Sequence, residues 1–201
     1  MDGSFESDVS AAKRSLRERV LVGRAEVSAE DLALAGAMIA ERLRGLPVVQ
    51  SARIVAAYIG VGVEVPTGRL VDELLESGQT VLLPVLEADR SLTWRPLSDR
   101  SQLVPGRHGL LEPQGSDSAR ALSDAQVVVL PGLCYDRSGN RLGRGGGSYD
   151  RALKDLPRAV RTIGIALDCD IFDSVPVQLH DRPVQMIVTP TRVITTENGG
   201  N

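Results

Sequence analysis

A cluster of glycines between a predicted strand and a predicted helix limits most strongly how this chain can fold. Of the twenty glycines in the sequence, four fall within five positions: Gly143, Gly145, Gly146 and Gly147. The apolar run 125–130 precedes the cluster and predicts a buried strand, and residues 148–156 after it are compatible with a helix. This order brings free backbone N–H groups and the N-terminus of a helix to one place, which favours the binding of an anion.

Charged side chains surround these glycines. Arg141, Arg144 and Arg151 supply positive charge, and Asp150 supplies one carboxylate. Arginine pairs well with phosphate oxygens, and a carboxylate beside a phosphate is a typical ligand of Mg²⁺. The segment therefore predicts a site for a phosphate chain with a metal ion. Its spacing matches neither a Walker loop nor a dinucleotide-binding fingerprint, and on composition alone a flexible loop is the alternative.

The segment 141–151, RLGRGGGSYDR, resembles the signature of the 5-formyltetrahydrofolate cyclo-ligases, also called methenyltetrahydrofolate synthetases. A second family pattern lies just upstream, and four residues match it: Pro131, Gly132, Tyr135 and Asp136. Ser148 departs from the signature, because the family usually has a tyrosine there. The resemblance extends over most of the chain, and it implies the Rossmann-like cyclo-ligase fold and an ATP-dependent activity.

Apolar runs alternate with helix-compatible runs along the chain, which predicts a three-layer α/β domain with a mostly parallel central sheet. At 201 residues we expect a single domain over 9–196, with a disordered segment 1–8 before it and a frayed tail 197–201 after it. The other expected helices cover 9–22, 28–44 and 67–77. The expected strands cover 52–59, 80–86, 92–95, 125–130, 161–167, 184–188 and 193–195. Residues 98–113 are expected to be rich in loops, and residues 168–179 are expected to be an irregular connector with at most a short helical turn.

The composition argues against several classes of function. A net charge of −3 and an aromatic content of 3% give neither the basic field nor the stacking surface that nucleic-acid binding needs. No apolar run approaches the roughly 18 residues of a membrane span, and the polar start is not a signal peptide. Cys134 and Cys169 lack metal-site spacing and are expected to be free thiols. We expect a cytoplasmic protein with no membrane or nucleic-acid partner.

The N-terminal helix is the second part of the predicted ATP site. Lys13 and Arg17 are four residues apart and share one helix face. Without other information, a solvated surface helix is the alternative. The string AKRSLR matches the family segment whose cations contact ATP phosphates, so Arg14 joins the set. In the glycine segment, the resemblance implies ATP contacts from Arg141, Gly143, Arg144, Gly145, Gly146, Gly147, Ser148 and Tyr149.

The predicted folate site lies after the first expected strand. Glu64 falls in the loop at the carboxyl end of that strand, where ligands bind in open α/β sheets. An ordinary solvated glutamate is the alternative. The family binds the folate head group with a Glu-x-x-Thr turn, and Glu64 to Thr67 fits that pattern. The resemblance also implies an apolar folate contact from Ile59 and a formyl pocket lined by Tyr149.

The resemblance implies Mg²⁺ held by Asp150. Its alternative is an aspartate placed in the first turn by the helix dipole. The family has a second acidic ligand shortly after a His-Asp pair, which here is His180 and Asp181. Gln185 stands at that second position and offers a neutral oxygen, and Asp181 or Asp168 could compensate. His108 and His180 are expected to be structural or solvent-facing, because two distant histidines do not make a metal site.

The resemblance implies an enzyme that closes 5-formyltetrahydrofolate to 5,10-methenyltetrahydrofolate and releases ADP and phosphate. ATP phosphorylates the formyl oxygen, and N10 then attacks the activated carbon. The catalytic residues are Arg144, Tyr149 and Asp150, and the protein is expected to be a monomer. The alternative is a nucleotide- or folate-binding relative with weak or no turnover, which Ser148 and Gln185 leave open. Closure of a different N-formyl substrate is a further alternative.

Overall fold

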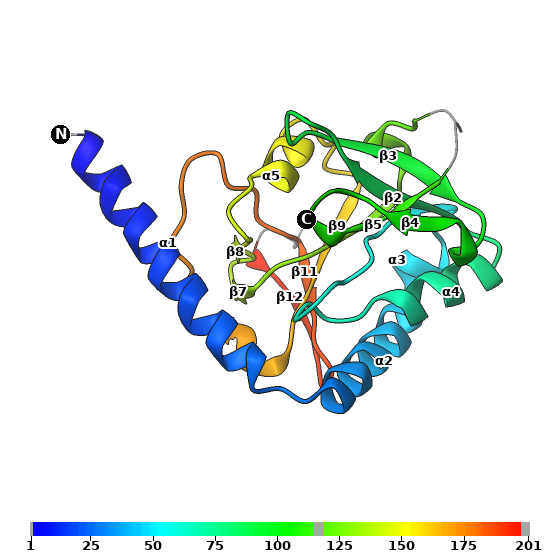
Figure 1. Ribbon diagram of the computed structural model, residues 1–201, viewed down its shortest axis with the longest axis horizontal. Helices are drawn as coiled ribbons and strands as arrows, with labels where there is room; N and C mark the ends of the chain where they lie inside the picture. Colours follow the sequence, from blue (N-terminus) through cyan, green and yellow to red (C-terminus); the bar gives the residue numbers. More distant parts are fainter. Residues whose placement is uncertain (1, 115–118, 198–201) are drawn as a thin grey trace.

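A seven-stranded sheet forms the centre of the computed structural model, which describes residues 2–114 and 119–197 (Figure 1). The strand order is β12-β11-β9-β6-β1-β2-β3, and the five inner strands run parallel. These inner strands are β2 (Thr80–Leu86), β1 (Ile54–Ala56), β6 (Val127–Leu130), β9 (Arg161–Ile165) and β11 (Met186–Val188). Antiparallel strands end the sheet on both sides: β3 (Leu92–Leu97) and β12 (Val193–Thr195).

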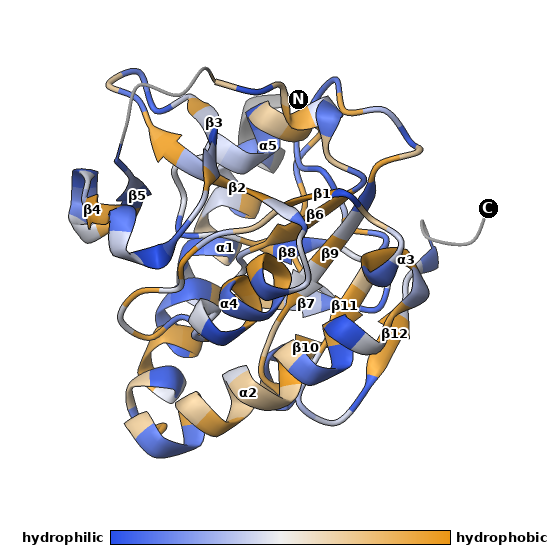
Figure 2. Ribbon diagram, turned by 90° about the vertical axis from the view of Figure 1, so that its right-hand side faces the viewer, coloured by the Kyte–Doolittle hydropathy of each residue, from blue (hydrophilic) through white to orange (hydrophobic). Residues whose placement is uncertain are grey.

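Both faces of this sheet are buried, as the continuous apolar runs of its strands require. All four residues of β6 are buried, and Figure 2 shows apolar colouring along the central strands. Successive side chains point to opposite faces, so Val127 and Val129 join one core cluster while Val128 and Leu130 join another. The two clusters place the sheet between two covering layers.

Helices α2 (Ala29–Gly45) and α4 (Gly68–Glu76) cover one face, with the short α3 (Pro47–Gln50) beside them. Ser28 caps α2 by accepting a hydrogen bond from the Asp31 N–H. The other face is covered by α5 (Ser148–Leu153), whose Leu153 packs in the second cluster with Trp94. The predicted three-layer α/β domain with a mostly parallel sheet is confirmed.

Helix α1 (Asp2–Ala25) lies along one side of the molecule against a small second sheet (Figure 1). That sheet consists of β10 (Ile171–Phe172), β7 (Cys134–Asp136) and β8 (Arg141–Leu142). Leu16 and Val20 of the helix pack against Leu133 and Leu142. The prediction of disorder over residues 2–8 was wrong, because they belong to α1. Of the predicted frayed tail, Glu197 accepts a hydrogen bond from Ser138, and residues 198–201, like Met1, lie outside the described part.

The region 98–113, predicted to be mostly loop, contains a hairpin of β4 (Leu103–Pro105) and β5 (Leu111–Pro113). Glu112 fixes the hairpin beside the end of β2, because its Oε1 accepts the Leu86 N–H at 3.0 Å. A Cβ atom at Gly106 would lie 2.2 Å from the Glu112 carboxyl carbon, so a larger residue there would displace the Glu112 side chain. The remaining elements are the single-turn helices η1 (Arg100–Gln102), η2 (Arg107–Gly109), η3 (Leu122–Asp124) and η4 (Asp168–Asp170).

The two cysteines, Cys134 and Cys169, are free thiols, as predicted. Burial raises the pKa of the Cys134 thiol to about 12, so it stays protonated. Over the described residues, the helices lack the combination of length and apolarity that crossing a bilayer requires.

The strand order changes direction at the centre of the sheet. From β1 the chain moves outward to β2 and β3, and it then returns to place β6 on the opposite side of β1. In open α/β sheets, ligands bind beyond the carboxyl ends of the strands at such a switch point. The topology therefore places a binding site above the ends of β1 and β6.

A buried arginine attaches the end of α1 to the rest of the fold. The Arg24 guanidinium pairs with Asp170 at 2.9 Å and donates to the carbonyls of Val63, Gly132 and Leu133. Both charged side chains are almost completely buried. Removing one partner of such a pair leaves an uncompensated charge and unpaired carbonyls in the interior.

We expect Arg24→Met to lower the free energy of unfolding by about 3–5 kcal/mol, because it leaves Asp170 charged and unpaired. Urea unfolding followed by circular dichroism measures this change. Arg14→Met is the matched control, since Arg14 is exposed on the same helix. Equal midpoints for the two variants would show that the buried pair does not hold α1 in place.

Candidate functional site

A cavity of about 700 Å³ opens at the switch point. Its walls come from the carboxyl ends of β1, β2 and β6, from one face of α1, from the glycine segment, and from residues 178–181. The volume is within the usual range of small-molecule sites. Most of the residues predicted for ATP and folate line it: Lys13, Arg17, Ile59, Glu64, Arg141, Gly143, Arg144, Gly145, Gly146, Gly147, Ser148, Tyr149 and Asp150.

The glycine segment adopts a backbone that other residues rarely take. Gly145 has φ +100° and Gly147 has φ +66°, both in the left-handed region. Two arginines hold the segment by its carbonyls: Arg17 Nε donates to Gly143 at 3.0 Å and Arg151 Nη1 donates to Gly146 at 3.2 Å. Arginines on either side of the segment therefore hold the carbonyls of Gly143 and Gly146. The segment itself forms part of the cavity wall.

An ion pair across the cavity joins the two predicted sites. Arg144 of the glycine segment donates from Nε to Glu64 Oε1 at 2.8 Å. The other oxygen of Glu64 accepts the Val61 N–H at 3.1 Å, which fixes the carboxylate in its loop. Glu64 is mostly buried, with a side chain 12% exposed, while the Arg144 side chain is 52% exposed. The residue predicted for phosphate and the residue predicted for folate are thus in direct contact.

A second ion pair connects α1 to the opposite wall. Lys13 Nζ contacts Asp181 Oδ2, and it also donates to Gln178 Oε1 at 3.1 Å. The same Asp181 oxygen accepts the Gln178 N–H at 2.7 Å. Asp181, which the sequence offered as a substitute acid, therefore lies in the cavity facing a predicted ATP residue.

Asp150 is held at the base of the cavity by two donors to one of its oxygens. Arg141 Nη2 lies 2.8 Å from Asp150 Oδ1, and the Arg182 N–H donates to the same oxygen at 3.1 Å. Arg141 also donates from Nη1 to the Arg182 carbonyl. The Arg141 side chain is only 4% exposed, so its guanidinium is largely engaged with protein acceptors.

Tyr149 packs its ring edge-on against Trp94, with centroids 6.2 Å apart and planes at 71°. This contact orients the tyrosine at the cavity wall. Burial raises the pKa of Tyr149 well above its ordinary value, and the nearby Glu64 carboxylate raises it further. The phenol therefore remains protonated and can donate a hydrogen bond.

Two predicted site residues do not reach the cavity. Arg14 is exposed and lies on another face of α1, since it is one residue on from Lys13 on a helix of 3.6 residues per turn. Gln185 lies just before the first residue of β11, which is the amino end of that parallel strand. Its Oε1 accepts the Thr162 N–H at 3.0 Å and its Nε2 donates to the Arg158 carbonyl at 3.4 Å. The placement of Gln185 at the metal was wrong.

Besides Glu64, which Arg144 engages, two acids of the cavity are available to a metal. Asp150 and Asp181 line the cavity, whereas Asp168 accepts hydrogen bonds from Thr189 and Thr191 elsewhere. In the described ranges no group of three or more metal-ligating side chains occurs. One or two carboxylates suit Mg²⁺ when phosphate oxygens complete the coordination. The donor set therefore fits a Mg²⁺ ion that arrives with a nucleotide.

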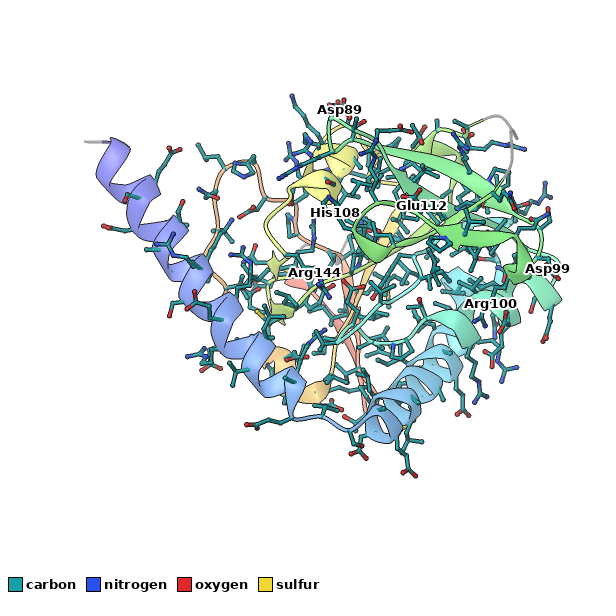
Figure 3. All side chains as sticks on the ribbon, in the orientation of Figure 1. Asp89, Asp99, Arg100, His108, Glu112 and Arg144 are labelled. Carbon is teal, nitrogen blue, oxygen red and sulfur yellow. The ribbon has the colours of Figure 1, made fainter. Side chains whose placement is uncertain are left out.

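Sequence reasoning missed part of the cavity wall. His108 and His180 are exposed, as expected, yet both lie at the cavity; Figure 3 labels His108 and Arg144, two residues of the cavity wall. Their neighbours come from strand ends and from the hairpin. These missed residues are Ser10, Tyr58, Val61, Pro84, Leu86, Arg90, Leu92, Leu110, Leu111, Pro131, Gly132, Leu133, Leu142 and Gln178. The switch-point rule, applied to every parallel strand, identifies those that follow β1, β2 and β6.

Residues 9–190 match the 5-formyltetrahydrofolate cyclo-ligase family. The chain belongs to this family. The chain is 38% identical over 191 residues to the 5-formyltetrahydrofolate cyclo-ligase of Mycolicibacterium smegmatis, with 90% of each chain covered. It is 33% identical over 162 residues to that of Escherichia coli, covering 79% of this chain and 89% of the relative. The solution structure of Aquifex aeolicus 5,10-methenyltetrahydrofolate synthetase superposes with a TM-score of 0.83 at 28% identity, covering 94% and 95% of the chains.

The position of Gln185 gives a test of the metal site. We expect Gln185→Asp to leave the Mg²⁺ dependence of ATP binding unchanged, because residue 185 lies at the other end of the sheet from the cavity. Asp181→Asn should instead weaken the Mg²⁺ dependence, because it removes a cavity carboxylate. Calorimetric titration of ATP at a series of Mg²⁺ concentrations compares the two variants. A lowered Mg²⁺ requirement in Gln185→Asp would show that the side chain at position 185 does lie at the metal.

Proposed function

We propose that this protein converts 5-formyltetrahydrofolate and ATP into 5,10-methenyltetrahydrofolate, ADP and phosphate. The observation that carries the proposal is the contact between Arg144 and Glu64, at 2.8 Å across one cavity. The first belongs to the phosphate-binding segment and the second to the loop expected to bind folate. Transfer between two substrates requires their reacting groups to meet, and this contact is where the two halves of the cavity meet.

The reaction replaces a poor leaving group with a good one. The formyl oxygen of the substrate attacks the γ-phosphorus of ATP, the bond from that phosphorus to ADP breaks, and ADP departs. N10 then bonds to the formyl carbon and loses its proton, and the carbon–oxygen bond breaks as phosphate leaves. The protein's task is to align the phosphoryl group with the formyl oxygen and to distribute its charge.

The cations of the cavity suit that task. We assign Lys13, Arg17 and Arg144 to the phosphates, together with backbone N–H groups of the glycine segment. Arginine binds phosphate in a fork of parallel hydrogen bonds, and lysine acts as a compact charge. Asp150 and Asp181 would hold Mg²⁺, which supplies charge neutralisation on the phosphates when it is bound.

The folate side of the cavity is less polar. Glu64 is assigned to the aminopyrimidinone edge of the ring, because a carboxylate accepts two hydrogen bonds from such an edge. Ile59 and Tyr58 offer apolar contact at the end of β1. The protonated Tyr149 is assigned to the formyl group, to which its hydroxyl can donate.

A binding protein without turnover is the second candidate, and Ser148 is the residue that favours it. Ser148 lines the cavity in place of the usual family tyrosine, and its Oγ accepts a hydrogen bond from Arg151 at 3.4 Å. Gln185 no longer supports this candidate, since its side chain is remote from the cavity. A complete cavity within one chain supports action as a monomer.

Absorbance of the methenyl product in the near ultraviolet separates the candidates. The protein should produce this absorbance from 5-formyltetrahydrofolate only when ATP and Mg²⁺ are present. A protein that only binds would show calorimetric affinity for both ligands and a flat absorbance trace. That second result would overturn the proposed activity.

The two halves of the site are tested by a reciprocal pair of variants. Arg17→Ala should raise the Michaelis constant for ATP by about tenfold or more, because a charge-assisted contact is worth roughly 1.5–3 kcal/mol. The constant for folate should stay unchanged. An unchanged Michaelis constant for ATP would show that Arg17 does not bind ATP and that α1 is a solvated surface helix.

Glu64→Gln should have the opposite effect, weakening the binding of 5-formyltetrahydrofolate without weakening that of ATP. It replaces one carboxylate oxygen by an amide that cannot accept the ring's hydrogen bonds. Calorimetry of each ligand alone measures both affinities, and Arg17→Ala serves as its control. Equal losses for both ligands would show that the substitution disturbs the cavity as a whole.

A further inference from the structure

Arg141 is a cation of the cavity wall whose contacts differ from those of the other cations. Lys13, Arg17 and Arg144 come from α1 or from the exposed glycine segment, whereas Arg141 lies in strand β8 with its side chain 4% exposed. Its backbone is fixed by pairing with Tyr135 of β7. A cation that is buried and anchored in this way has little freedom to follow a ligand.

The guanidinium of Arg141 connects two segments that carry the cavity acids. Nη2 donates to Asp150 Oδ1 at 2.8 Å, and Nη1 donates to the carbonyl of Arg182. The Arg182 N–H in turn donates to the same Asp150 oxygen. Asp181, a second acid of the cavity, directly precedes Arg182. One side chain therefore fixes helix α5 against the segment that holds Asp181.

This arrangement leaves the second oxygen of Asp150 available. Both donors act on Oδ1, so they set the plane of the carboxylate without occupying Oδ2. A planar guanidinium can hold two acceptors in a fixed geometry, which the single ammonium of a lysine cannot reproduce. Groups that orient a metal-binding carboxylate typically change metal affinity by about 10–100-fold when they are altered.

We propose that Arg141 is a positioning residue, which sets the orientation of Asp150 and its spacing from Asp181, and is not a phosphate ligand. This inference rests on the proposed function, because it concerns how the Mg²⁺–ATP site is held. It replaces the direct ATP contact that the sequence predicted for Arg141. Arg141 acts on the nucleotide only through Asp150 and the segment around Arg182.

The test compares ATP binding by Arg141→Lys with and without Mg²⁺. Calorimetry in Mg²⁺ should show ATP binding weakened by about tenfold or more, whereas calorimetry in EDTA should show a change of less than about twofold. A direct phosphate ligand would weaken binding in both conditions equally, and that result would overturn the proposal. Arg137→Lys is the matched control, because Arg137 is an exposed arginine in the turn between β7 and β8.

Folding of the variant is followed by the emission of the single tryptophan, Trp94, which packs on Tyr149 next to Asp150. An unchanged spectrum shows that α5 keeps its packing. If Arg141→Lys does not fold, Arg141→Gln, which keeps a planar donor, is measured against the same criteria. In the Asp150→Asn background, Arg141→Lys should have no further effect on Mg²⁺-dependent binding, since its target is gone. Additive losses would contradict the proposal.

Failure of this inference is distinguishable from failure of the proposed function. If the unaltered protein binds ATP equally in Mg²⁺ and EDTA and forms no methenyl product, the proposed function fails whatever Arg141 does. If the unaltered protein shows both properties and Arg141→Lys behaves like Arg137→Lys, the positioning role alone is overturned.

Discussion

Repulsion between like charges is the constraint on which the cavity depends. A site for a triphosphate must gather cations, and cations without partners would push its walls apart. The structure places an acid against three of them: Asp181 against Lys13, Asp150 against Arg141, and Glu64 against Arg144. Each pair joins two different elements, so the balance of charge also fixes the shape of the cavity. The three pairs hold α1, α5 and the glycine segment together.

The sheet topology makes those pairs possible. Glu64 and Arg144 are 80 residues apart in the sequence, and they meet because β1 and β6 are neighbouring parallel strands. Parallel strands present their carboxyl ends at one edge, so the loops that follow them converge there. The buried Arg24 stabilises the same edge, since it donates hydrogen bonds to carbonyls in the loops after β1 and β6. Function at this edge therefore follows from strand order as much as from any single motif.

The sequence was sufficient for the elements with strong local patterns, and most of its motif residues lie in one cavity. Strands β2 and β12 have the predicted bounds, because continuous β-branched or apolar runs end at clear turns. The prediction failed where a long-range contact decides the outcome. Gln185 matched a motif by its spacing, but its position before β11 places it at the amino edge of the sheet. Residues 2–8 looked too polar to be ordered, and they continue the helix whose later turns pack on β8. The ion pairs between distant segments left no local signal.

These ion pairs also determine what substrate binding has to do. A phosphate that reaches Lys13 or Arg144 takes the place of a carboxylate, so the cation exchanges one anionic partner for another and is not left alone in a partly buried site. The displaced acids keep partners of their own, because Asp181 still accepts the Gln178 N–H and Glu64 still accepts the Val61 N–H. Asp150 is different, since Arg141 holds it from the buried side and the nucleotide approaches from the open one. The cavity thus contains two kinds of ion pair: those whose partners can exchange when ligands bind, and one that stays in place and keeps the geometry.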